Sequence, residues 1–284
     1  MKRKAVFITI FSFWAVTNLL AQTIQETWEF ANLQYSRGNF KQALPEYQRV
    51  AFFDESGIYS DVYQKTAESF YALEQYDRAL QNFDIASRLA ENDSLKTELL
   101  FRKADCYFQQ NNFLFALNEL LVIPDPENLY LQTKYNLYMG IGNFGIGNFE
   151  ESQEYFSTII TAGTLPELNE IFTGFEKFRK RFRPSKIQTM SIIFPGLGQF
   201  YSGYFASGLN SLLLVGSIAT AGVYIWQVYG IPDALLSMGS WYYRYYSGGY
   251  QNAEILAIEK IGHEQEKVYR EIMQLVQNNL MLKE

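Results

Sequence analysis

The stretch SRGNFKQALPEYQRV, residues 36–50, has three further copies along the chain and decides the fold. The matching segments are ALEQYDRALQNFDIA at 72–86, QQNNFLFALNELLVI at 109–123 and GIGNFEESQEYFSTI at 145–159. A small residue holds the same place in each copy, and successive copies lie 36, 37 and 36 residues apart. A period of this length is typical of stacked helical repeats. The four small residues, which we expect to pack between helices, are Ala43, Ala79, Ala116 and Ser152.

Larger side chains recur at fixed distances from these small residues. An aromatic residue lies three positions before each one, and a large apolar residue lies four positions after it. About half a unit earlier stands a second small residue, which is Ala31, Ala67, Ala104 or Gly140. Small residues at fixed places on two consecutive helices let the helix backbones approach closely. The pattern resembles the tetratricopeptide repeat, and it predicts four such repeats over residues 22–165.

The resemblance implies a curved stack of helix pairs whose concave face holds a peptide or a partner helix. Residues 22–165 contain 20 acidic and 10 basic residues. Two interpretations of this charge stay open: it attracts a basic segment of a protein partner, or it only keeps the surface soluble.

The N-terminus, MKRKAVFITIFSFWAVTNLLAQ, has the pattern of a secretory signal peptide. A basic start precedes an apolar run, and Ala21 offers a small residue for cleavage. We therefore predict a signal peptide over residues 1–21, with an uncleaved anchor as the alternative, and either predicts export. Removal of residues 1–21 would change the formal charge from −6 to −9, which argues against nucleic acid as a partner.

Motifs that suggest chemistry have structural explanations in this sequence. Gly140, Gly142 and Gly145 match the G-x-G-x-x-G pattern, but a dinucleotide site also requires a preceding strand, whereas the repeat register predicts a helix here. The single histidine, His263, stands in a charged helical segment, and the single cysteine, Cys106, falls inside a repeat. We therefore predict no catalytic residues, no metal site and no cofactor, and expect a protein that is not an enzyme.

The composition changes abruptly over residues 166–186, where we predict a helix beside a membrane. Basic residues alternate here with three phenylalanines, a mixture that suits the headgroup layer of an anionic bilayer. The residues predicted to contact lipid headgroups are Lys177, Arg179, Lys180, Arg181, Arg183 and Lys186.

Residues 187–248 are predicted to form a membrane hairpin. From 187 to 243 the only ionisable carboxylate or base is Asp233. Residues 209–229 would make a helix about 31 Å long, which matches the hydrocarbon core of a bilayer. Pro232 then interrupts the chain, and aromatic residues of the kind that prefer the membrane interface are dense from 241 to 246.

The segment just before this apolar helix predicts a turn, which we name the elbow. Proline lacks an amide donor and glycine weakens a helix, so the freed backbone groups need partners at membrane depth. We expect Gln199 to supply a hydrogen bond, in a structural role rather than a substrate-binding one. The elbow residues are Pro195, Gly196, Gly198, Gln199, Tyr201 and Gly203.

The segments PGLGQFYSGYFASGLNSLLL and WYYRYYSGGYQNAEILA together look like the C-terminal membrane region of a group of bacterial repeat proteins. The positions that carry this resemblance are Pro195, Gly196, Gly198, Gln199, Tyr201, Gly203, Asn210, Trp241, Gly248, Asn252 and Ala253. The resemblance implies a protein of the bacterial cell envelope, with no catalytic residues to carry over. Repeats in the periplasm would put the basic residues on the exported side of an inner-membrane span, against the positive-inside tendency, so inner and outer membrane both stay open.

Residues 249–284 are predicted to form a C-terminal amphipathic helix. The predicted fold is therefore all-α: a tetratricopeptide-like solenoid, a membrane hairpin and this final helix. The function that fits is a membrane-anchored scaffold or adaptor that recruits a protein partner, within an assembly or secretion complex. The alternative is that the hairpin itself handles lipid or polymer and the repeats regulate it.

Overall fold

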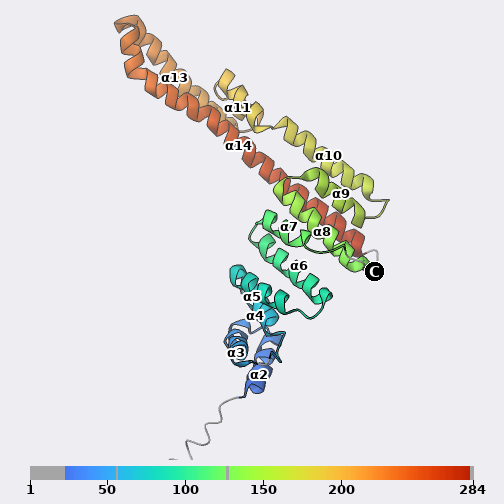
Figure 1. Cartoon of the computed structure of the whole chain (residues 1–284). Coiled ribbons are helices and arrows are strands. Elements are labelled where there is room, and N and C mark those ends of the chain that lie inside the picture. The colour runs from blue at the N-terminus through green and yellow to red at the C-terminus, as the bar shows by residue number, and fades with distance from the viewer. Residues whose placement is uncertain (1–22, 56, 126–127, 282–284) are drawn as a thin grey trace, which may run out of the picture. The chain divides into compact units, whose positions relative to one another are not determined.

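The structure is a computed structural model that describes residues 23–55, 57–125 and 128–281. Every regular element in these ranges is a helix, which confirms the predicted all-α class (Figure 1). The chain divides into two compact units, Met1–Asn148 and Phe149–Glu284, so the boundary falls inside the predicted fourth repeat. The predicted signal peptide, residues 1–21, lies outside the described residues.

The first unit is a succession of helices in which each helix packs against the next one along the chain. Paired helices are joined by short turns, and their contacts are between neighbours, as expected of a linear array. The helices are α2 (Ile24–Ser36), α3 (Phe40–Phe53), α4 (Val62–Ala72), α5 (Tyr76–Leu89), α6 (Asp93–Gln109), α7 (Phe113–Leu121) and α8 (Leu129–Ile146).

The turn that follows the first helix of each pair has the same backbone geometry in all four copies. One residue takes a positive φ, and the amide of the next residue donates to the carbonyl five positions earlier at 2.8–2.9 Å, which is the hydrogen bond of a Schellman cap. The next helix then begins at the aromatic residue of the repeat. The positive-φ residues, spaced as in the sequence repeat, are Gly38, Glu74, Asn111 and Gly147.

We predict that Glu74→Gly stabilises the protein by about 1 kcal/mol. Glu74 has a φ of 59°, a left-handed conformation that costs an L-residue about 1–2 kcal/mol, part of which is offset by the larger unfolded-state entropy of glycine. Urea unfolding of the full chain in neutral detergent measures the change. The reciprocal control is Gly38→Ala, at a φ of 75° with open space around the Cβ, which should lose a similar amount. An unchanged midpoint for Glu74→Gly would contradict the strain argument.

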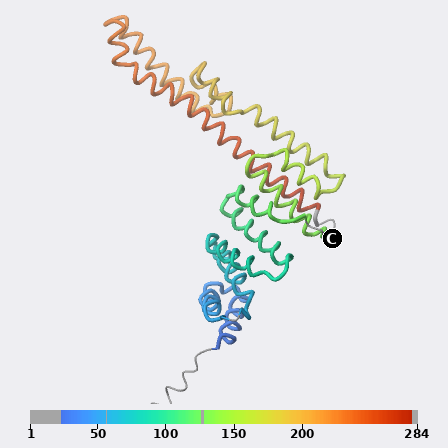
Figure 2. Tube along the Cα trace, in the orientation of Figure 1, coloured from blue at the N-terminus to red at the C-terminus, as the bar shows by residue number. Residues whose placement is uncertain are grey.

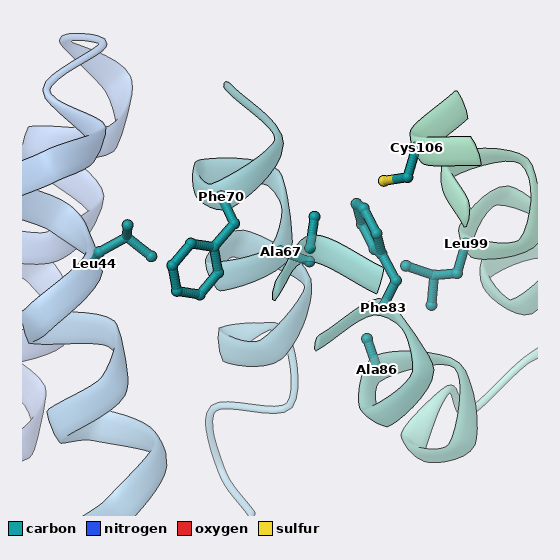
Figure 3. Close-up of a cluster of buried hydrophobic side chains, with 8 residues drawn as sticks. Leu44, Ala67, Phe70, Phe83, Ala86, Leu99 and Cys106 are labelled. Atoms are coloured by element: carbon teal, nitrogen blue, oxygen red, sulfur yellow. The ribbon is translucent and has the colours of Figure 1, made fainter. Parts of the chain in front are cut away.

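The core of the first unit is built from the small and large residues of the repeat. Ala43, Ala79 and Ala116 are fully buried, and so is Ser152 in the second unit. Phe83 lies beside Ala67 and Leu99 between helix pairs (Figure 3). Small residues therefore stand where helices approach, and aromatic rings fill the space between pairs.

The second unit is organised around one helix, α14 (Ile231–Met281), which has 51 residues and is about 76 Å long. It packs against every other helix of the unit. Its first part runs beside α13, and its second part lies along α10 and α9 (Figure 2). The other helices are α9 (Phe149–Ile159), α10 (Leu165–Arg181), α11 (Pro184–Ile193), α12 (Leu197–Tyr201) and α13 (Phe205–Tyr229).

A buried asparagine ties the C-terminal end of α14 to the loop between α9 and α10. The Asn279 side-chain oxygen accepts from the Thr161 amide at 3.2 Å, from the Thr161 hydroxyl at 3.0 Å and from the Thr164 hydroxyl at 2.7 Å. Its amide group donates to the Leu275 carbonyl at 2.9 Å. Because each polar atom of this buried side chain has a partner, α14 is fixed firmly at this end.

Two predicted segment boundaries differ from the observed helices. The segment 166–186 is divided between α10 and α11, because Pro184 holds the preceding Arg183 in an extended conformation (ψ 124°) and starts a new helix. The boundary at 248/249 lies inside α14, which is continuous there. Gly249 lies inside this helix and lets α13 approach closely, since a Cβ at this position would lie 2.5 Å from the Ser211 Oγ.

Candidate functional site

The elbow between α11 and α13 contains the short helix α12, and its backbone requires glycine at two places. Gly196 precedes α12 with a φ of 88°, and a Cβ there would overlap the Gly208 carbonyl oxygen. A Cβ at Gly198 would overlap the Ile187 carbonyl oxygen and lie 2.6 Å from the Ser191 Oγ. The chain therefore folds back on α11 and α13 more closely than any side chain would allow.

Gln199 lies at the centre of a buried hydrogen-bond network in the elbow. Its side chain is 1% exposed, its oxygen accepts from the Ser191 hydroxyl at 2.8 Å and its amide donates to the Gly249 carbonyl at 2.8 Å. Ser191 also accepts from the Gly198 amide at 2.9 Å. The prediction that Gln199 bonds the freed elbow backbone is therefore wrong in detail: Ser191 satisfies that amide, whereas Gln199 links the elbow to α14.

No sequence motif indicated that Ser191 or Lys260 contacts the elbow. Ser191 lies in the last turn of α11, and Lys260 of α14 donates to the Ser202 carbonyl at 2.9 Å. Asn252, a position of the resemblance to bacterial repeat proteins, contacts the Ser207 hydroxyl at 3.2 Å, and Ala253 is fully buried. The two separated parts of that motif therefore meet at the elbow.

Two predicted elbow residues lie away from the buried network. Gly203 has a φ of 88° in the turn after α12. The Tyr201 hydroxyl lies 3.4 Å from Lys186 Nζ, and its ring centroid lies 5.9 Å from that of Phe182. Hydrogen bonding to Lys186, with help from nearby Arg181, lowers the pKa of Tyr201 below its usual value. Tyr201 therefore belongs to the basic surface beside the elbow.

All six predicted headgroup residues are exposed. We call this set the basic collar; its members are Lys177, Arg179, Lys180, Arg181, Arg183 and Lys186. The aromatic residues between them turn inward, since Phe175 and Phe182 are buried and Phe178 packs on the same core. The sequence interpretation, in which cations and aromatics meet the headgroup layer together, is therefore corrected: only the cations face solvent.

Helices α13 and α14 form an antiparallel pair that turns at Gly230, where φ is 105°. Gly249 lies against Ser211 near the elbow, and Gly222 lies against Met238 farther along. Among the described residues, α13 is the one helix that is long and apolar enough to cross a membrane, and 17% of its apolar window is buried. An apolar hollow of about 390 Å³ opens between the two helices toward the turn.

Aromatic rings stack along α14 at the part of the pair nearer the elbow. Trp241 stacks on Tyr245 at 6.2 Å, and Tyr242 stacks on Tyr246 at 5.6 Å. The Tyr246 hydroxyl donates to the Ile192 carbonyl at 2.7 Å, which joins this aromatic row to the end of α11. The row therefore lies at the level where α11 and α12 meet.

Polar side chains connect the first helices of successive pairs in the first unit. Their spacing is about one repeat, and several carboxylates are engaged in these contacts. These contacts are Tyr35 to Glu68 at 2.6 Å, Lys65 to Asn32 at 2.7 Å and Lys134 to Glu98 at 2.8 Å. Lys103 of α6 instead pairs with the second helices on either side, Asp84 of α5 at 2.6 Å and Glu119 of α7 at 2.7 Å. Part of the acidic excess is therefore used to hold neighbouring helices together.

The residues that could suggest a catalytic, metal or nucleotide site in the sequence do not come together in the structure. Cys106 is fully buried, and burial raises the pKa of its thiol to about 12. His263 is exposed on α14, 3.6 Å from Glu259. Gly142 and Gly145 are helical residues of α8 that give room to Leu117 and Phe113. In the part of the chain that the structure describes, no three His, Cys, Asp or Glu side chains group in a way that could hold a metal ion.

Comparison of the chain with protein-family models, with curated proteins and with solved structures finds no match.

Proposed function

We propose that this protein is a membrane-anchored scaffold of the bacterial cell envelope, whose α13–α14 hairpin lies in lipid while its repeats hold a protein partner. The observation that carries the proposal is the exposed apolar surface of α13. A core helix of a soluble protein would be mostly buried, whereas only 17% of the apolar window of α13 is covered. Lipid is the environment in which such a surface is stable.

The antiparallel arrangement sets the topology of the hairpin. Since α14 returns along α13 and then packs against α9, α10 and α11, the chain enters and leaves the bilayer on the same side. From the turn at Gly230, a hydrocarbon core of about 30 Å extends over about 20 residues of each helix. This places the near edge of the core at about residue 209 of α13 and about residue 251 of α14.

The charged residues of the hairpin agree with this depth. Asp233 stands next to the turn, where it would meet the headgroups of the far leaflet. Arg244 is exposed and lies about seven residues inside the near edge, within reach of the surface by snorkelling of its long side chain. Tyr245, Tyr246 and Tyr250 flank that edge, as aromatic residues of the interface do.

In this proposal the four repeats over residues 22–165 fold as tetratricopeptide-like helix pairs that bind a segment of a protein partner. The recurring turn and the buried small residues support this fold of the repeats. The net acidity of residues 22–165 favours a basic partner segment, and nucleic acid is excluded by charge. Export by a signal peptide at residues 1–21 would put the repeats in the periplasm, and the protein acts by binding, not as an enzyme.

Cysteine labelling across a vesicle membrane tests the topology. Ile231→Cys at the turn is combined with Cys106→Ala, and the full chain is reconstituted into phospholipid vesicles with its repeats outside. A membrane-impermeant maleimide should label Ile231→Cys only from the vesicle interior, and should label a control, Leu114→Cys on α7, from outside. Labelling of Ile231→Cys from outside would show that the hairpin is not inserted, and protection from both sides would show that it does not cross.

The apolar hollow between α13 and α14 supports a second candidate, direct handling of lipid or polymer by the hairpin. This hollow of about 390 Å³ has room for part of an acyl chain. Ala219→Leu, which fills part of the hollow and leaves the elbow unchanged, separates the two functions. The scaffold predicts that partner capture survives this change, whereas direct handling predicts the loss of activity with the hollow.

A further inference from the structure

A second hollow, of about 510 Å³, opens on the surface of the second unit where α10 ends and α11 begins. Three cations of the basic collar line it, together with two hydroxyl groups and one apolar side chain. The lining residues are Lys180, Arg183, Ser185, Lys186, Thr189 and Met190. The Thr189 hydroxyl donates to the Ser185 carbonyl at 2.7 Å, so the lining offers an anion the three cations and the Ser185 hydroxyl, beside an apolar wall.

The residues that line the hollow include three cations and no carboxylate. Lys180 pairs with Glu176, but both side chains are mostly exposed, so the pair is weak and open to competition. Lys186 Nζ lies 4.9 Å from the centroid of the Tyr201 ring, so the cation is held beside the hollow. An anion is therefore the ligand that this surface fits.

The first turn of α11 adds to the attraction. Pro184 occupies the first position of the helix, and the N-cap residue, Arg183, makes no side-chain capping bond. Pro184 has no amide, and the amides of Lys186 and Ile187 donate to the Arg183 carbonyl at 3.0 and 3.1 Å, so the helix contributes chiefly the positive end of its dipole. Phosphate is an anion that a cluster of Lys and Arg binds well.

We propose that this hollow binds the phosphate group of an anionic phospholipid headgroup. The assignment of lipid as the source rests on the proposed function, because it requires an inserted hairpin. Ile187 on α11 packs with Ala253 and Ala257 of α14, so the hollow lies at the base of the hairpin. That level is about 3–9 Å beyond the hydrocarbon edge near residue 251, which is the depth of the headgroup layer. Met190 then faces the apolar side of the bound lipid.

Binding is measured on the full chain in neutral detergent, by calorimetry with dihexanoyl phosphatidylglycerol and separately with inorganic phosphate. Arg183→Gln with Lys186→Gln removes two charges from the hollow and should weaken phosphatidylglycerol binding about 30-fold. The control, Lys267→Gln with Arg270→Gln, removes the same charge from exposed positions of α14 outside the hollow and the basic collar, and should change binding less than three-fold. Urea unfolding of each variant checks that the fold is retained.

Equal losses in the two variants would overturn the proposal, because they would show a general charge effect. If inorganic phosphate binds as tightly as phosphatidylglycerol, the ligand of the hollow is free phosphate and the assignment to a lipid headgroup is rejected. Flotation with vesicles of phosphatidylcholine alone tests the proposed function separately, since hairpin insertion needs no anionic lipid. If the full chain floats with these vesicles but the two variants bind phosphatidylglycerol equally, the hairpin anchor is retained and the proposed headgroup site is rejected.

Discussion

Replacing Thr220 and Val223 with arginine should release the full chain from phospholipid vesicles. Both residues are exposed on α13, Thr220 ten and Val223 seven residues from the turn at Gly230, and so lie near the bilayer centre in the proposed topology. An arginine at that depth costs about 2.5–3.5 kcal/mol on insertion scales, so the two together should lower partitioning about 10⁴-fold. Flotation of vesicles on a density gradient measures the bound fraction.

The matched control places the same charges outside the hairpin. Leu114 and Leu129 are exposed apolar residues of the first unit, and their replacement by arginine should leave flotation unchanged. Circular dichroism of both variants in detergent checks that helix content is retained. If Thr220→Arg with Val223→Arg floats as the unmodified chain does, α13 is not in contact with the hydrocarbon core and the scaffold loses its anchor.

Gly198→Ala should destabilise the second unit by about 3–5 kcal/mol, although it adds a single methyl group. The new Cβ would overlap the Ile187 carbonyl oxygen, which belongs to the backbone of α11 and cannot rotate away. Movement of α12 would then break the bonds that Gln199 makes to Ser191 and Gly249, leaving a buried amide without partners. Urea unfolding of the full chain in detergent, followed by the fluorescence of Trp226 and Trp241, measures the loss.

Gly174→Ala is the control for this change. Gly174 is a residue of α10 around which an added Cβ meets nothing within 4 Å, so alanine should stabilise the helix by up to about 1 kcal/mol. Opposite signs for the two alanine substitutions would show that close approach, not glycine flexibility, determines the elbow. A Gly198→Ala chain that unfolds at the same urea concentration as the unmodified protein would contradict the close contact with α11.

The periodic features of the fold could be predicted because they depend on local chemistry. The 36- and 37-residue spacing reappears as four identical turns, since each copy carries its aromatic residue where the second helix of the pair begins. Glu74 and Asn111 adopt the conformation that glycine takes in the other two copies, which no propensity scale would assign to Glu74. The positive φ of these two residues was therefore not predicted, although the repeat register places them opposite Gly38 and Gly147.

Features that depend on contacts between distant segments could not be predicted. Phe175 and Phe182 alternate with cations along the chain, but helical geometry turns them to the face that packs in the core. The prediction that cations and aromatic rings face the lipid together was therefore wrong. The role of Ser191 depends on Gly198 folding back over α11, a contact that no spacing indicates. The close approach of Gly249 to Ser211 likewise joins positions 38 residues apart.

The length of α14 has a mechanical consequence for the second unit. One unbroken helix joins the hairpin to the loop held by Asn279, so the two ends behave as opposite arms of a lever. Between Gly249 and Asn279 the rod measures about 45 Å, and a rocking motion of about 10° at the hairpin would displace the far end by about 8 Å. Bilayer thinning or thickening, which changes the inclination of inserted helices, would thus be amplified into movement of α9 and α10.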